Sequence, residues 1–199
     1  MSRDSEREAV QAFSNKSELE QVLTAGIHGA PELKKDEKRQ YLGVFREQVL
    51  AILSTKQIKE TVLYSEIAQA LEDKRSAKLI INGGINNRFT KKYKLLARKL
   101  NKPYTVVSDP DYAQTTGLVV ASDEAVDIEE VSIEDRALRL RNLGVPDTLI
   151  QSTGKKVCAE CLQHILNIDP QEKINYDELT WLDRITGEHC PAHAEDSSK

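Results

Sequence analysis

Three short apolar runs, separated by an amphipathic segment, dominate the hydrophobic pattern of residues 77–121. The runs at 78–81, 104–107 and 117–121 have the length and composition of strands. The amphipathic segment has a helical period, and Pro103 ends that helix because proline disfavours the helical conformation in the residue before it. The pattern predicts an α/β fold, a mixed sheet with helices on its faces. The apolar positions of the helix are Phe89, Tyr93, Leu96, Ala97 and Leu100.

Weaker patterns flank this core. Helical spacing of apolar residues predicts a long helix at 35–54 and a shorter one at 64–73. We expect residues 126–128 to extend the edge of the sheet, and Ser132 to cap a further helix. The buried stripe of the long helix is predicted to be Leu42, Phe45, Val49, Ile52 and Leu53.

These patterns divide the chain into three parts. Residues 1–16 are polar and weakly periodic, which predicts a flexible N-terminus, either a frayed helix or disorder. Residues 17–128 contain the α/β pattern. Residues 133–199 form a predicted helical module that carries all three cysteines.

The composition indicates a soluble protein, but its charges are unevenly distributed. Of the 199 residues 30% are charged, no apolar run could span a bilayer, and the first residues lack the apolar core of a signal peptide, so we expect a cytoplasmic protein. Residues 86–102 carry seven basic and no acidic side chains, whereas 123–135 carry seven acidic and no basic ones. Both blocks can be explained as solvated surfaces. Alternatively, the basic helix contacts a nucleic-acid backbone. The candidate contacts are Arg88, Lys91, Lys92, Lys94 and Arg98.

The C-terminal cysteines have the spacing of a metal site. Cys158 and Cys161 are separated by two residues, and so are Cys190 and His193. Three thiolates and one imidazole complete the tetrahedral shell that zinc prefers, and a closed shell is typical of a structural site. His189 is an alternative fourth ligand.

Two other interpretations of the cysteines stay open. They could be unrelated packing residues, or Cys158 and Cys161 could form a redox pair. Between the two ligand pairs, residues 176–182 predict a helix that packs Leu179 and Trp181 near the metal. His164 is interpreted as a surface histidine.

A polar loop follows the first predicted strand. Ligands bind at the carboxyl ends of strands in open α/β sheets, so this loop is a candidate small-ligand site. The glycine spacings of nucleotide-binding motifs and the nucleophile elbow of hydrolases are absent, and the sequence assigns no catalytic residue. The loop residues are Asn82, Gly83, Gly84, Asn86 and Asn87.

Several segments match the order and spacing of a known family: 26–32, 41–49, 77–84, Lys92-Tyr93 with Leu96-Ala97, and 117–126. Over residues 17–128 the chain resembles the YueI-like family of small bacterial proteins. The resemblance implies a fold similar to chorismate-mutase-like and kink-turn-binding ribosomal proteins, and it implies no activity or catalytic residue. Kink-turn readers place Gly-Asn-Glu at a helix start, and the corresponding residues 55–60 lack that triplet.

Three functional hypotheses follow. The leading one is a non-enzymatic cytoplasmic binding protein, associated with RNA or a ribonucleoprotein and carrying a structural zinc. The first alternative is a small-ligand sensor or enzyme that uses the loop at 83–87. The second is a protein-interaction module that docks through residues 133–199.

Overall fold

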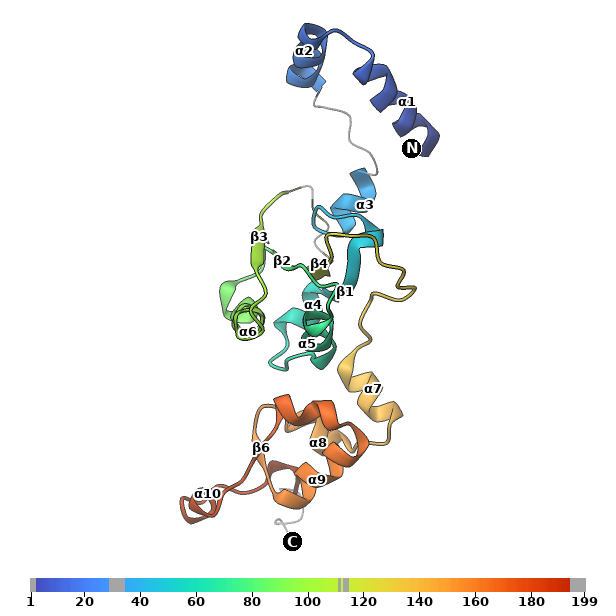
Figure 1. The fold of residues 1–199 in the computed structure, drawn as a ribbon. Coiled ribbons are helices and arrows are strands. Elements are labelled where there is room, and N and C mark those ends of the chain that lie inside the picture. Colours follow the sequence, from blue (N-terminus) through green and yellow to red (C-terminus); the bar gives the residue numbers. More distant parts are fainter. Residues whose placement is uncertain (1–2, 29–34, 111, 113–114, 194–199) are drawn as a thin grey trace.

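A four-stranded mixed sheet forms the centre of the molecule (Figure 1). The computed structural model describes residues 3–28, 35–110, 112 and 115–193. The strands stand in the order β1-β4-β2-β3; β4 is antiparallel to β1 and β2, while β3 is parallel to β2. The predicted α/β class and mixed sheet are confirmed. The strands are β1 (Val49–Ser54), β2 (Lys78–Asn82), β3 (Tyr104–Val107) and β4 (Thr116–Ala121).

One face of the sheet is covered by helices. These are α4 (Thr55–Lys59), α5 (Ser65–Glu72) and α6 (Asn87–Lys99). Tyr64 and Tyr93 are fully buried in the core under them, and every residue of β4 is buried because β4 lies inside the sheet. The predicted helical stripe of α6 therefore faces the core.

The opposite face is covered by irregular chain, although we predicted helices on both. Tyr41 and Leu42 pack there against Val119 and Ile80, and Val131 closes the same cluster. The alternation of β2 and β4 residues between the two faces follows from the two-residue period of a strand.

The long helix predicted at 35–54 is wrong. Helix α3 (Lys35–Gln40) is short, a 3-10 turn η1 (Arg46–Gln48) follows, and the rest is β1. Leu42 and Gly43 have φ angles of 54° and 96°, which end the helix. Residues 49–53 form an unbroken apolar run, which suits a strand and a helix equally; pairing with β4 decides for the strand.

The two ends of the chain are largely helical. The glycines and the proline of residues 26–31 also predict a helix break; residues 26–28 still belong to α2, and residues 29–31 lie outside the described ranges. No helix within the described ranges is long and apolar enough to cross a bilayer. The elements are α1 (Arg3–Ser14) and α2 (Glu18–His28), then α7 (Arg136–Asn142), α8 (Asp147–Gln151), β5 (Lys156–Val157), α9 (Ala159–Ile168), the 3-10 helix η2 (Pro170–Asn175), β6 (Asp177–Glu178) and α10 (Trp181–Ile185).

Three local predictions near the C-terminal module need correction. Residues 126–128 form no strand; the chain touches β1 at Ser132 through a single bridge. Asp135, rather than Ser132, caps the next helix, because its carboxylate accepts the first free N–H groups of α7. The helix predicted at 176–182 is instead β6 followed by α10, and Trp181 is exposed while Leu179 is buried.

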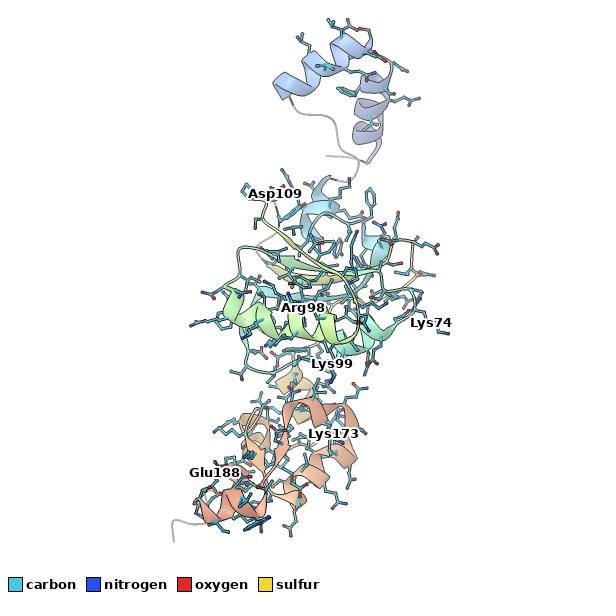
Figure 2. The ribbon with its side chains drawn as sticks, turned by 60° about the vertical axis from the view of Figure 1, so that its left-hand side comes forward. Lys74, Arg98, Lys99, Asp109, Lys173 and Glu188 are labelled. Atoms are coloured by element: carbon cyan, nitrogen blue, oxygen red, sulfur yellow. The ribbon has the colours of Figure 1, made fainter. Side chains whose placement is uncertain are left out.

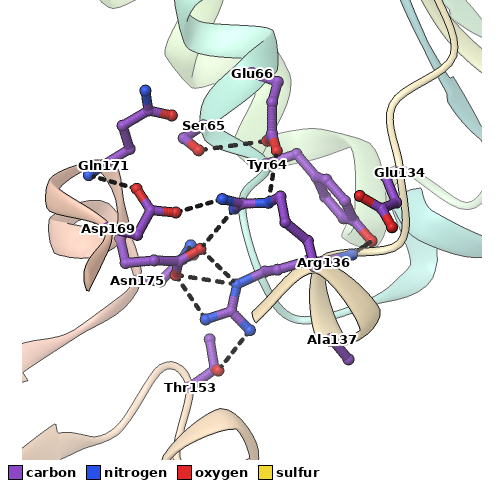
Figure 3. Close-up of polar contacts among 12 residues, drawn as sticks. Tyr64, Ser65, Glu66, Glu134, Arg136, Ala137, Thr153, Asp169, Gln171 and Asn175 are labelled. Atoms are coloured by element: carbon purple, nitrogen blue, oxygen red, sulfur yellow. Dashed lines mark hydrogen bonds and ion pairs between the residues drawn. The ribbon is translucent and has the colours of Figure 1, made fainter. Parts of the chain in front are cut away.

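A buried ionic network attaches the C-terminal module to the α/β core (Figure 3). The guanidinium of Arg136 binds the Glu172 carboxylate at 2.6–3.0 Å, and both side chains are almost fully buried. Arg139 bridges Glu172 to Glu66 on α5, at 3.2 Å from each. The Asn175 side chain exchanges two 2.9 Å hydrogen bonds with the backbone of Leu63.

Candidate functional site

Short local structure presents the two cysteine-containing pairs. Cys158 follows β5 and is the N-cap residue of α9, so Cys161 lies in the first turn of that helix. Cys190 and His193 belong to one tight turn, in which the backbone N–H of His193 donates to the carbonyl of Cys190 at 3.1 Å. Strands β5 and β6 pair in parallel, and this brings the later segment back to the start of α9.

The ligand atoms of all four residues lie within 4.8 Å of one another. The sulfur of Cys161 is 3.4 Å from Nε2 of His193, and that of Cys158 is 3.9 Å from Nδ1. Ligands about 2.3 Å from a tetrahedral zinc ion are separated by about 3.8 Å. The cluster therefore has the donor set and the size of a metal site. His189, the alternative ligand, does not belong to it.

The electrostatics of the cluster are those of crowded thiols. Burial, with the neighbouring sulfurs of Cys158 and Cys190, raises the pKa of Cys161 to about 12. Burial opposes ionisation of Cys190 too, but hydrogen bonds from the backbone N–H groups of Cys158 and Ala192 lower its pKa overall. Three thiolates repel one another at these distances, and a divalent cation removes that repulsion.

A cleft of about 650 Å³ opens at one edge of the sheet. Four of the five predicted loop residues line it; Asn87 is the exception, and its side chain accepts a hydrogen bond from Lys94 at 2.7 Å. Asp109, also in the lining, lies on the side of the α/β core that faces away from the C-terminal module (Figure 2). The lining residues that the sequence did not identify include Thr55, Lys59, Ser108, Asp109 and Tyr112.

The missed lining residues follow β1 and β3. The sequence does not place Thr55 and Lys59 at the cleft, because it predicts a helix at 35–54 where the structure has strand β1. The turn that begins at Ser108 was identifiable from its Asp-Pro pair, and a parallel arrangement of β2 and β3 would have placed it beside the glycine loop.

The five predicted nucleic-acid contacts differ in exposure: three are exposed, and Lys92 and Lys94 are partly buried. Arg88, Lys91 and Arg98 are exposed on α6 (Arg98 is labelled in Figure 2), but Arg98 also donates to the hydroxyl of Tyr104 at 2.9 Å. Lys92 is half-buried: its ammonium donates to the carbonyl oxygens of Glu60 and Val62, and burial lowers its pKa to about 8. Lys92 thereby stabilises the loop before α5.

Taken together, the fold and the cluster define an α/β protein with a cysteine–histidine module at its C-terminus. The family described as "Protein of unknown function (DUF1694)" matches residues 16–132, more than half of the chain, and the chain belongs to this family. The cysteine–histidine cluster lies beyond the matched segment.

Comparison with individual proteins confirms the resemblance to YueI-like proteins. The chain is 30% identical over 121 residues to the Uncharacterized protein YueI of Bacillus subtilis (strain 168), which covers 61% of this chain and 92% of YueI. The crystal structure of the YueI protein from Bacillus subtilis is similar, with a TM-score of 0.50 at 30% identity over 61% of this chain and 94% of that one.

Proposed function

We propose that this chain is a non-enzymatic binding protein whose C-terminal module is folded around a structural zinc ion. The observation that supports it is the convergence of three sulfurs and one imidazole within 4.8 Å. Protein side chains would fill all four positions of a tetrahedral shell, which leaves none for a reacting water or substrate. Zinc would join the turn at Cys190 to the start of α9, although residues 162–189 separate the two ligand pairs in the sequence.

Elemental analysis tests this proposal. The purified protein is expected to contain one zinc per chain, and Cys161→Ser to contain almost none, because a missing thiolate opens the shell. His164→Asn is the matched control, since His164 is an exposed residue on the same helix, and it should keep its zinc. A wild-type protein free of metal, or loaded with iron instead, would contradict the proposal.

RNA or ribonucleoprotein association is a second candidate function. It is supported by the exposed side chains of Arg88 and Lys91 on α6, a helix that carries no acidic residue. Single-stranded RNA would be held through its phosphates, so affinity should fall with salt.

Charge reversal tests this second function. For a labelled poly-uridine RNA, the variant Arg88→Glu/Lys91→Glu should bind more weakly, and the slope of log affinity against log salt should fall by about 1.4, at roughly 0.7 per phosphate contact. The control is Lys155→Glu/Lys173→Glu, which makes the same change of charge at two exposed lysines of the C-terminal module. Equal binding by both variants would show that α6 is only a solvated surface.

A further inference from the structure

We propose that the cleft at the sheet edge binds a small organic anion, a molecule with a carboxylate or phosphate group attached to an apolar or aromatic part. The cleft shares no residue with the cysteine–histidine cluster, so this inference is independent of the zinc proposal.

The position of the cleft follows from the strand directions. Because β4 is antiparallel to both β1 and β2, and β3 is parallel to β2, the strands β1, β2 and β3 all run the same way. Their carboxyl ends therefore meet at one edge. The segment after each strand contributes to the cleft: Thr55 and Lys59 after β1, the glycine loop after β2, and Ser108 after β3. This is the edge at which open α/β sheets bind ligands.

The cleft is large enough for a metabolite and is held in shape by close packing. Its volume of about 650 Å³ falls within the range of small-molecule sites, roughly 300–1,000 Å³. A Cβ atom at Gly83 would lie 2.0 Å from Oγ of Ser108, so glycine permits the loops after β2 and β3 to touch. The Asn82 amide donates to the carbonyl of Thr116 at 2.9 Å and accepts from the N–H of Gly84 at 3.0 Å, which holds the glycine loop.

The lining determines the chemistry of the ligand. Ile85, Phe89 and Pro110 supply apolar surface. Among the described lining residues Lys59 is the only cation, and it makes no ion pair with any residue that the structure describes, so its charge is available to a ligand. Asp109 is the only carboxylate among the described lining residues, which favours a ligand of low negative charge. An anionic group directed at Lys59 would leave the rest of the molecule against the apolar wall.

Thermal shift with defined probes tests the inference. Benzoate and phenyl phosphate represent the two anionic groups, and benzyl alcohol is the uncharged control. We expect at least one anion to raise the melting temperature of the wild-type protein, because a ligand that binds only the folded state stabilises it. The anion that raises the melting temperature shows whether the site prefers a carboxylate or a phosphate group.

Two variants and a matched control locate the effect. Lys59→Met should weaken binding of the active probe about tenfold, since a charge-assisted hydrogen bond is lost, whereas Lys56→Met, an exposed lysine of the same helix outside the cleft, should bind normally. Ser108→Trp should abolish binding by filling the cleft. The inference is overturned if neither anion shifts the wild-type protein, or if the two lysine variants respond alike. Zinc content, which none of these variants should alter, keeps this test separate from that of the metal site.

Discussion

Removal of the proposed zinc ion by a chelator is expected to release residues 177–193 from the C-terminal module while the four-stranded sheet stays folded. That segment has few other attachments: helix α10 buries no residue, and β6 is two residues long. Leu179 is its main buried side chain, and its backbone N–H donates to the carbonyl of Val157 at 2.8 Å. A metal that binds only the folded site contributes its binding free energy directly to folding.

Hydrogen exchange measured by mass spectrometry is the appropriate readout. After chelation, peptides covering β6, α10 and the start of α9 should exchange at least about tenfold faster, while peptides of β4 keep their protection. His193→Asn should behave like the chelated protein, and His189→Asn should behave like the wild type, because only His193 belongs to the cluster. Unchanged exchange after complete zinc removal would mean that the metal does not support the module.

Replacement of Arg136 by alanine should be strongly destabilising. Arg136 and Glu172 are both almost fully buried, so the substitution leaves a buried carboxylate without its main partner. Breaking such a pair from one side costs about 3–5 kcal/mol of unfolding free energy. Denaturant titration measures this loss.

Arg141→Ala provides the matched control. Arg141 lies on the same helix and pairs with Asp147 at 2.6 Å, but both partners are more than half exposed, so the loss should not exceed about 1 kcal/mol. The double replacement Arg136→Met/Glu172→Leu should recover part of the stability lost in Arg136→Ala, since it removes both buried charges. Equal losses for Arg136→Ala and Arg141→Ala would contradict a structural role of the buried network.

The metal cluster was accessible to sequence reasoning because its signal is local. Each ligand pair sits in a single turn, and a two-residue gap presents both side chains to one side. The sequence left the choice between His189 and His193 open, because both histidines lie close to Cys190 in the same short segment. The folded turn brings only His193 to the sulfurs.

Lys92 illustrates the opposite case. In the sequence it is one of seven basic residues in a block without acidic ones. Helical spacing places Lys92 beside the apolar stripe, three residues after Phe89 and four before Leu96, but it does not identify the groups that Lys92 contacts. Those groups lie in the loop before α5. The carbonyl groups of Glu60 and Val62 in that loop accept hydrogen bonds from Lys92.

The amino-acid sequence by itself determined the α/β class, three of the four core strands, helix α6 and the four candidate metal ligands. Each depends on contacts between near neighbours in the chain: a strand-length apolar run, a helical period or a tight turn. Only the tertiary structure decided that residues 49–54 form a strand, that an arginine–glutamate pair is buried in the C-terminal module, and that three strand ends enclose a cleft. These features require segments far apart in the chain to pair, and the free energy of that pairing has no local signature.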